Sequence, residues 1–219
     1  MGTHAKHLVW DWNGTLLDDI GAVIGATNAA FAELGLEAIT LERYRELYTV
    51  PVPKFYERLM GRLPTEAEWA VMDTAFHRHY WARAEGCGLT AGAAELLAAR
   101  QESGFTQSLL SLAPHAELIP LVARHGITER FLRVDGRTDN STDGKSGNMA
   151  RHLAALDGVP AERVVVIGDA ADDAVAALSV GARAVLYTGG SHSRRSLESV
   201  GVPVVDSLAE AVAVADELV

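Results

Sequence analysis

The sequence has little of several features that define other classes of protein. Only one of its 219 residues is a cysteine, Cys87, which excludes an intrachain disulfide framework and a metal site built from several thiolates. No apolar run approaches the roughly 18–20 residues that a membrane helix needs. The start, MGTHAKHLVWDW, lacks the charged region and long apolar run of a secretory signal. We therefore expect a cytoplasmic protein with no membrane partner.

Positive charge is also scarce. The chain has 19 Lys and Arg against 29 Asp and Glu, a formal net charge of −10, and its cations are not clustered. Contacts to nucleic-acid phosphates need clustered cations, so we expect no nucleic-acid partner. With 48% hydrophobic and 22% charged residues, the composition is that of a globular protein that can bury a sizeable core. The sequence predicts no particular oligomeric state.

Short apolar runs alternate with helical patterns over most of the chain. The expected strands are 7–12, 106–111, 131–134, 164–167, 184–187 and 202–205. The expected helices between and after them include 114–125, 147–156 and 207–217. Such alternation predicts an α/β fold with a Rossmann-like, doubly wound parallel sheet, whose ligands bind beyond the carboxyl ends of the strands.

The pattern changes after the first strand. Long amphipathic stretches at 20–34, 41–47 and 66–83 contain no convincing strand, and Pro51 and Pro53 interrupt them. We expect a small all-helical domain over 18–87, inserted into a sheet domain formed by 1–17 and 88–219.

Carboxylates follow two of the expected strands. Asp11 opens the turn Asp-Trp-Asn-Gly-Thr, and Asp169 follows Gly168, with Asp172 and Asp173 shortly after. Each segment alone also fits a structural role, as a turn or as the charged start of a helix. Carboxylates that converge at one sheet edge repel one another, however, and Mg²⁺, which prefers oxygen ligands, relieves that repulsion.

Two further polar residues lie near expected strand ends. Ser111 ends the second strand and precedes Pro114, a good residue for a first helical turn, so hydroxyl and helix N-terminus could together seat a phosphate. Lys145 is one of only three lysines, with Lys6 and Lys54, and it lies in the polar loop 137–147.

The ordered set strand-DxxGT, strand-Ser, loop-Lys and strand-GDxxxD resembles the four motifs of the haloacid dehalogenase (HAD) superfamily of phosphohydrolases. The resemblance covers nearly the whole chain. The helical insertion resembles the family's C1 cap, and GDAADDAVAALSVGA resembles its GDxxxDxxxAxxAG segment. The phosphoglycolate-phosphatase-like branch is the nearest. This resemblance implies a HAD-type phosphoric monoester hydrolase that uses Mg²⁺ and acts on a small phosphorylated metabolite.

The resemblance also implies roles for single residues. Asp11 is the expected nucleophile, which forms an aspartyl-phosphate intermediate. The expected Mg²⁺ ligands are Asp11, the backbone carbonyl of Asn13, Asp169 and Asp173. The expected phosphate-binding groups are Ser111 and Lys145, with backbone N–H groups among Trp12, Gly14, Thr15, Leu112 and Ala113.

One departure from the family pattern bears on catalysis. Family phosphatases usually carry an aspartate two residues after the nucleophile as general acid and base, whereas this chain has Asn13. An amide cannot transfer that proton, and general acid–base catalysis typically contributes about 10²–10⁴-fold. We expect slow hydrolysis of alkyl phosphates and a preference for good leaving groups. By residue type alone, Asp18, Asp19, His77 and His79 are candidates to replace the acid.

Two other functions remain open at this point. Asn13 also fits a catalytically impaired phosphate-binding or regulatory module. A phosphonatase-like C–P hydrolase would need a cap lysine that forms a Schiff base, and Lys54 is the only one available. The basic residues Arg43, Arg45, Lys54 and Arg58 either reach an anionic substrate or form a solvated helix face. The nearby aromatic residues Tyr44, Tyr48, Phe55 and Tyr56 have the spacing of a helix core.

Overall fold

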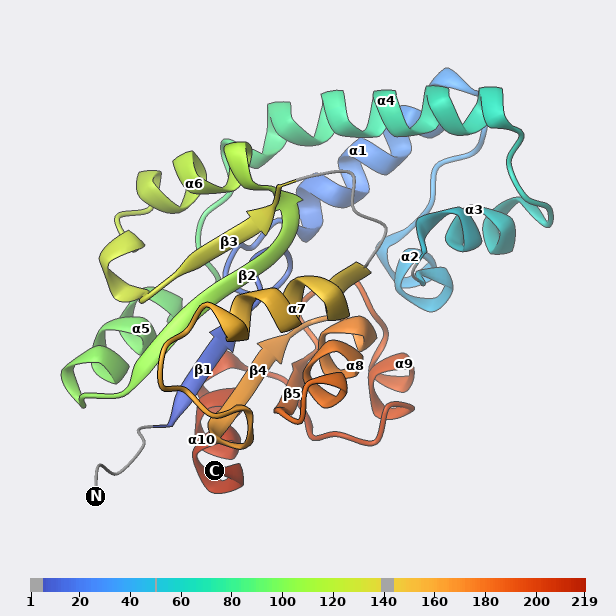
Figure 1. The fold of residues 1–219 in the computed structure, drawn as a ribbon. Coiled ribbons are helices and arrows are strands. Elements are labelled where there is room, and N and C mark those ends of the chain that lie inside the picture. Colours follow the sequence, from blue (N-terminus) through green and yellow to red (C-terminus); the bar gives the residue numbers. More distant parts are fainter. Residues whose placement is uncertain (1–5, 50, 139–143) are drawn as a thin grey trace.

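The centre of the molecule is a parallel sheet of six strands. The computed structural model describes residues 6–49, 51–138 and 144–219. Its strand order is β3-β2-β1-β4-β5-β6, and all neighbours are parallel (Figure 1). The strands are β1 (His7–Trp10), β2 (Thr106–Pro114), β3 (Val134–Arg137), β4 (Val164–Gly168), β5 (Arg183–Tyr187) and β6 (Val204–Val205). The predicted doubly wound sheet is therefore confirmed.

Helices cover both faces of this sheet because β1 and β4 are apolar on both sides. Leu8 and Trp10 of β1 face a core shared with α5 (Ala93–Glu102), α6 (His115–Arg124) and α10 (Leu208–Leu218). Val9 faces the opposite core, which contains residues of α7 (Gly144–Ala154), α8 (Ala171–Ser179) and α9 (Arg194–Glu198). Short 3₁₀ helices occupy Thr128–Arg130 and Ala161–Arg163. The strand order reverses between β1 and β4, where ligands of such sheets bind.

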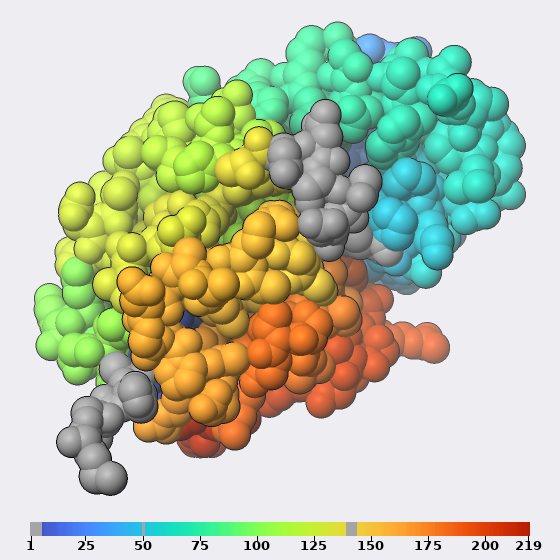
Figure 2. Space-filling model, viewed as in Figure 1, coloured from blue at the N-terminus to red at the C-terminus, as the bar shows by residue number. Residues whose placement is uncertain are grey.

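Four helices between β1 and α5 form a separate lobe, which we call the helical insertion (residues 20–84). They are α1 (Ile20–Glu33), α2 (Leu41–Leu47), α3 (Val52–Met60) and α4 (Glu66–Ala84). The long helices α1 and α4 pack side by side (Figure 1), and the space-filling view shows the insertion as one body beside the sheet part (Figure 2). A second apolar cluster, which includes Phe31, Phe55 and Met72, fills its interior.

The chain enters and leaves the helical insertion at the same place. Leu17 and Leu89 form an antiparallel bridge, the Asp18 N–H donates to the Gly88 carbonyl at 3.0 Å, and the Thr90 N–H donates to the Leu16 carbonyl at 2.9 Å. The insertion is thus attached through two paired segments, close to the turn that follows β1.

The structure corrects two details of the predicted elements. The strand expected at 131–134 runs instead over Val134–Arg137, because Thr128–Arg130 forms a 3₁₀ helix and Phe131, the extended residue that ends it, packs against the core. The prolines interrupt the insertion as expected, but Pro51 is the N-cap of α3, a helix that the sequence analysis missed. Proline suits this position because the first turn of a helix needs no N–H donor there.

A buried chain of polar side chains ties β1, β2, β3 and α7 together. The Ser108 hydroxyl contacts His7 Nε2 at 2.8 Å and His152 Nε2 at 2.7 Å, and His152 Nδ1 lies 2.7 Å from an Asp135 carboxylate oxygen. Ser108 is fully buried in mid-strand, so this serine, histidine and aspartate stabilise the packing. Within the described ranges, no helix combines the length and apolarity needed to cross a membrane.

We predict that Leu8→Ala lowers the free energy of unfolding by about 2–5 kcal/mol, because it leaves a cavity at the centre of the sheet. Leu8 is 0% exposed. Leu132→Ala is the matched control, because Leu132 is 62% exposed and its truncation should change stability by less than about 0.5 kcal/mol. Urea unfolding of both variants measures the difference, and equal losses would contradict the assigned core.

Candidate active site

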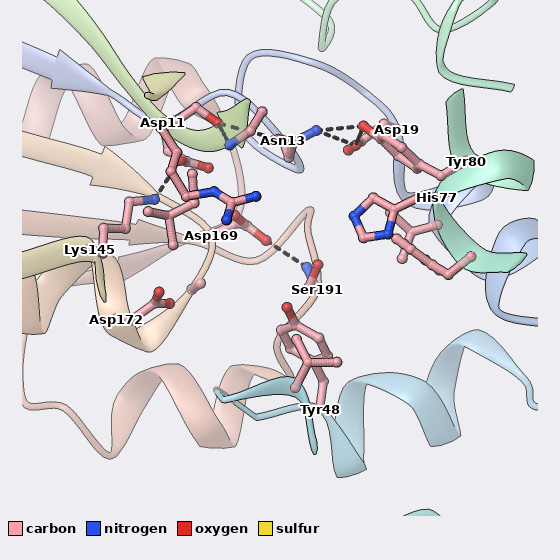
Figure 3. Close-up of a pocket in the computed structure, with 18 of the residues that line it drawn as sticks. Asp11, Asn13, Asp19, Tyr48, His77, Tyr80, Lys145, Asp169, Asp172 and Ser191 are labelled. Carbon is pink, nitrogen blue, oxygen red and sulfur yellow. Dashed lines mark hydrogen bonds and ion pairs between the residues drawn. The ribbon is translucent and has the colours of Figure 1, made fainter. Parts of the chain in front are cut away.

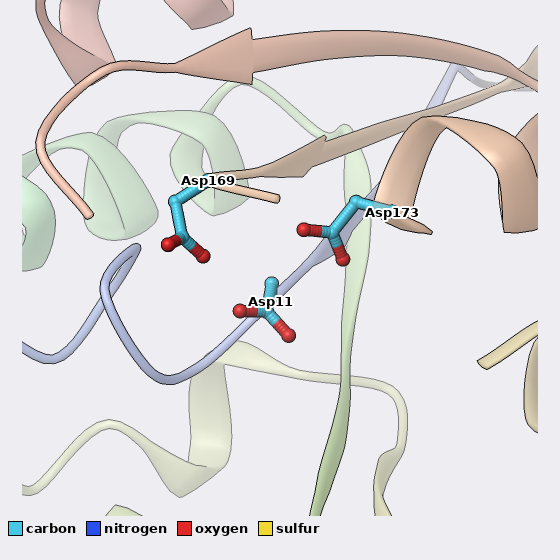
Figure 4. Close-up of side chains that lie close together, drawn as sticks. All are labelled: Asp11, Asp169 and Asp173. Atoms are coloured by element: carbon cyan, nitrogen blue, oxygen red, sulfur yellow. The ribbon is translucent and has the colours of Figure 1, made fainter. Parts of the chain in front are cut away.

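Three buried carboxylates meet at the carboxyl edge of the sheet. Asp11 directly follows β1, Asp169 directly follows β4, and Asp173 lies in the first turn of α8 (Figure 4). Their exposed fractions are 6%, 4% and 0%, and one oxygen from each lies within 4.8 Å of the others. The turn after β4 permits this approach because residue 168 is glycine: an added Cβ would lie 2.2 Å from the Asp173 side chain. The predicted convergence of these carboxylates is present.

Lys145 completes this cluster. Its Nζ lies 2.5 Å from Asp11 Oδ1 and also contacts Asp173 Oδ1. The prediction of a loop is wrong for this residue, which lies in the first turn of α7; residues 139–143 of that loop are outside the described part. Burial alone would lower the pKa of Lys145, but the Asp11 and Asp173 carboxylates raise it well above its usual range. Lys145 is therefore a fixed positive charge beside Asp11.

One ammonium group does not neutralise all of this negative charge. Burial raises the pKa of Asp11 to about 7, against the opposing effect of Lys145. Burial and the Asp11 carboxylate also raise the pKa of Asp169 well above its usual range. Asp172 Oδ1 is buried and has no hydrogen-bond partner among the described residues. An oxygen-only set of this kind fits a hard divalent cation such as Mg²⁺, which would favour the ionised carboxylates.

The turn after β1 is held by hydrogen bonds to its own neighbours. Gly14 adopts a φ of 68°, and an added Cβ would lie 2.6 Å from Asp169 Oδ2. Its N–H donates to Asp19 Oδ1 at 2.7 Å, and the Thr15 N–H donates to the Trp12 carbonyl at 3.3 Å. These two N–H groups were expected to face a phosphate, but here they have other acceptors. None of Trp12, Gly14 and Thr15 lines the pocket described below.

Asn13 stands between Asp11 and the helical insertion. Its Nδ2 donates to Asp19 Oδ2 at 2.8 Å and to the Tyr80 hydroxyl at 2.6 Å, and that hydroxyl donates to Asp19 Oδ2 at 2.7 Å. Its Oδ1 accepts a hydrogen bond from the Ser111 hydroxyl at 3.4 Å (Figure 3). The Asp19 carboxylate, 1% exposed, thus fixes which end of the amide faces the site.

The four candidates for a replacement acid differ in how close they lie to Asn13 and to the pocket described below. Asp19 touches Asn13, and burial raises its pKa against the lowering effect of the Tyr80 and Asn13 hydrogen bonds. His77 lines the pocket, with Nδ1 at 2.8 Å from the Asp73 carbonyl. Asp18 is exposed, and His79 contacts Glu33 on the surface of the insertion.

A pocket of about 330 Å³ lies between the sheet edge and the helical insertion. The sheet part contributes Asp11, Ser111, Lys145 and Asp169, with Leu112 beside them. Sequence reasoning missed a further residue at this pocket, Arg137 at the end of β3, which the strand predicted at 131–134 left out. The insertion contributes Val23, Tyr44, Tyr48, Val52, Phe76, His77, Tyr80 and Trp81 (Figure 3).

The basic residues of the insertion do not line this pocket. Arg43 pairs with Glu46, and Arg58 donates to the Leu47 carbonyl. Lys54 is exposed, which removes the one lysine that a phosphonatase-like reaction could use. By contrast, two aromatic residues expected only in the helix core, Tyr44 and Tyr48, line it.

Arg45 fastens the insertion to the sheet part. Its guanidinium donates to the carbonyls of Gly189 and Gly190 at 2.7 and 2.8 Å. Beside it, the Tyr48 and His192 rings meet edge to face, with centroids 5.0 Å apart. These contacts hold the insertion closed over the pocket.

We predict a pH-dependent contribution from His192, which is 5% exposed. Burial lowers its pKa from 6.5 to about 4, against the nearby Asp173 carboxylate. Between these values the unfolded chain binds the proton and the folded chain does not, so acid favours unfolding. The free energy of unfolding should therefore fall more steeply from pH 7 to pH 5 in the wild type than in His192→Phe. Urea unfolding at several pH values measures both, and a difference independent of pH would contradict the prediction.

Comparison with known proteins agrees with this geometry. The parallel α/β fold and the carboxylates at its edge are those of a hydrolase of the HAD type, and the family model for haloacid dehalogenase-like hydrolases matches residues 5–181. The chain belongs to this family.

Two relatives of the chain are both named phosphoglycolate phosphatases. The chain is 28% identical over 189 residues to a phosphoglycolate phosphatase of Cereibacter sphaeroides, covering 84% of this chain and 85% of that protein. It is 29% identical over 180 residues to a plasmid phosphoglycolate phosphatase of Cupriavidus necator, covering 78% and 75%. A predicted phosphatase from Clostridium acetobutylicum has the same fold, with a TM-score of 0.83 at 17% identity over 99% of this chain and 100% of that one. The expected family and the expected class, a phosphatase-type hydrolase, are confirmed.

Proposed function

We propose that this protein is a Mg²⁺-dependent phosphatase that hydrolyses a small phosphorylated metabolite through an aspartyl-phosphate on Asp11. The observation that carries the proposal is the position of Asp11, which lies at the pocket within 4.8 Å of Asp169 and Asp173 and 2.5 Å from Lys145. A nucleophile surrounded by such groups suits phosphoryl transfer, which depends mainly on positioning and charge stabilisation.

In the first step a carboxylate oxygen of Asp11 attacks phosphorus, and the bond from phosphorus to the leaving oxygen breaks. Water then hydrolyses the aspartyl-phosphate, which restores Asp11 and releases phosphate. Lys145 and the Ser111 hydroxyl offset the negative charge on the transferring oxygens, and Arg137 supplies a further cation at the pocket. The Asp11 side chain is held in place by the strand that precedes it and by Lys145.

Asp11, Asp169 and Asp173, with the backbone carbonyl of Asn13, are the groups that would hold Mg²⁺. The ion would supply positive charge that binds the phosphoryl group and favours the ionised form of Asp11. The fit rests on the burial of three carboxylates and on the scarcity of cations among them.

Residues 18–87 act in this proposal as a cap. Arg45 and the ring contact of Tyr48 with His192 close it over the sheet edge, where exclusion of water strengthens electrostatic interactions inside the pocket. Cap opening at the paired segments near Leu17 and Leu89 would admit substrate and release phosphate.

Asn13 favours a second candidate, a module that binds phosphate without turnover. Its amide cannot protonate the leaving oxygen, and Asp19 and Tyr80 hold it in a fixed orientation. The intact set of Asp11, Ser111 and Lys145 supports the enzyme instead.

We predict that phosphate release from p-nitrophenyl phosphate requires Mg²⁺ and Asp11. Chelation of the metal and Asp11→Asn should each reduce turnover to the background, because one removes the balancing charge and the other the nucleophile. Asp11→Asn should keep the fold, as circular dichroism will show. Full activity of Asp11→Asn would refute the assigned nucleophile, whereas wild-type binding of phosphate and Mg²⁺ without turnover on any substrate would establish the binding module.

We predict that Asn13→Asp raises turnover of alkyl phosphates by at least about tenfold, because it restores a group that can protonate the leaving oxygen. The new carboxyl group would contact the Asp19 carboxylate, and the repulsion between them would raise the pKa of one of the two carboxyl groups and favour its protonated form. Asn13→Ala removes the amide without adding an acid and should bring no gain. Equal rates for Asn13→Asp and Asn13→Ala would contradict the role of this position, and intact mass must show that Asn13 has not deamidated in the wild type.

A further inference from the structure

The part of the pocket formed by the helical insertion is mostly apolar and aromatic, and it also includes the His77 imidazole. Tyr48 directly after α2, Val52 from α3, and Phe76 and Trp81 from α4 line the same pocket as Asp11. Figure 3 shows Tyr48 across this pocket from Asp11. Phe76 and Tyr80 are stacked at 5.7 Å between ring centroids, and Tyr80 meets Trp81 edge to face at 5.0 Å. Phe76, Tyr80 and Trp81 thus form one connected set of rings, and Tyr48 adds a further ring at the same pocket; we call these four residues the aromatic wall.

This wall carries no lysine or arginine. The seven such residues of the insertion all lie within its described part, and none lines the pocket: Arg43, Arg45, Lys54, Arg58, Arg62, Arg78 and Arg83. Arg45 is bound to the Gly189 and Gly190 carbonyls, while Arg62 and Arg78 pair with Glu68 and Glu33. A substrate with a second anionic group at this end, such as phosphoglycolate, would bury a carboxylate against aromatic rings, which is unfavourable.

The amide of Asn13 also limits which substrates can react. Because no acid stands at this position, the leaving oxygen must depart without a proton from residue 13. A phenol has a pKa near 10, whereas an ordinary alcohol is closer to water at about 15.7, so a phenoxide leaves much more readily.

We propose that the natural substrate is a small aryl phosphate, whose phosphate meets Asp11 and whose ring lies against the aromatic wall of the helical insertion. The proposal rests on the phosphatase function above and names its substrate class. A pocket of about 330 Å³ is in the range that proteins use for small ligands, and edge-to-face contacts with Tyr48 and Phe76 would orient the ring.

Three substrates separate ring binding from leaving-group chemistry. Phenyl phosphate has both the ring and a good leaving group, benzyl phosphate has the ring with an alkyl leaving group, and 2-phosphoglycolate has neither. With Mg²⁺, kcat/KM should be at least about tenfold higher for phenyl phosphate than for 2-phosphoglycolate. Benzyl phosphate should have a KM close to that of phenyl phosphate and a kcat at least about tenfold lower. Equal or faster hydrolysis of 2-phosphoglycolate would overturn the proposal and leave the phosphatase function intact.

Two exposed valines of the insertion provide a matched pair of variants. Val52 is 37% exposed and lines the pocket, whereas Val71 is 42% exposed and does not. Val52→Arg would place a cation at the aromatic wall and should raise kcat/KM for 2-phosphoglycolate, relative to phenyl phosphate, by about fivefold or more. Val71→Arg adds the same charge elsewhere and should leave that ratio unchanged. An unchanged ratio in Val52→Arg would show that the wall does not contact the substrate, and would overturn the proposal.

Binding of inert analogues keeps the proposal testable if no substrate turns over. In that case the phosphatase function fails, and titration calorimetry with phenylphosphonate and phosphonoacetate decides the ligand class independently. Tighter binding of phenylphosphonate would support an aryl ligand. If phenylphosphonate binds no more tightly than phosphonoacetate, the proposal of an aryl ligand is overturned.

Discussion

The repulsion among Asp11, Asp169 and Asp173 is the constraint on which the rest of this site depends. The sheet forces the contact, because Asp11 and Asp169 follow neighbouring parallel strands whose register places Trp10 beside Ile167. Burial then makes the contact costly unless positive charge balances it. Lys145 supplies part of that charge from the first turn of α7. The remaining negative charge would favour a divalent cation, and in the proposed function that ion and Lys145 would together attract the phosphoryl group.

Much of this arrangement was predictable from the sequence because it depends on strand ends. Buried strands such as 164–167 are apolar throughout, and the polar residue that follows each one must lie at the carboxyl edge of the sheet. Asp11 and Asp169 could therefore be assigned to that edge from the sequence alone, whereas Ser111, expected to end its strand, lies inside β2, which continues to Pro114. Lys145 was harder to place, because its loop lacks apolar periodicity, and only the structure shows it as part of a helix.

The insertion was predictable as a helical body but not as a binding surface. Its side chains have alternative partners that only tertiary structure decides: Arg45 binds carbonyls of the sheet part instead of an anionic substrate, while Tyr48 both packs against the core of the insertion and lines the pocket. Helical spacing alone does not separate these outcomes, because Tyr44, Tyr48 and Phe55 also contact one another as core residues would.

Asn13, the residue that departs from the family pattern, belongs to a set of hydrogen bonds that links the two parts of the molecule. Asp19 accepts hydrogen bonds from the Gly14 N–H, the Asn13 amide and the Tyr80 hydroxyl, so one carboxylate joins the nucleophile turn to α4 of the cap. An aspartate at position 13 would set two carboxylates in contact and would remove a donor from this set. Asn13 and Asp19 are therefore physically matched, because an amide instead of an acid beside Asp11 lets the buried Asp19 carboxylate bind both the turn after β1 and α4 of the helical insertion. In the proposed mechanism the same exchange favours leaving groups that need no proton, and the aromatic wall lines the pocket in which such a group would bind.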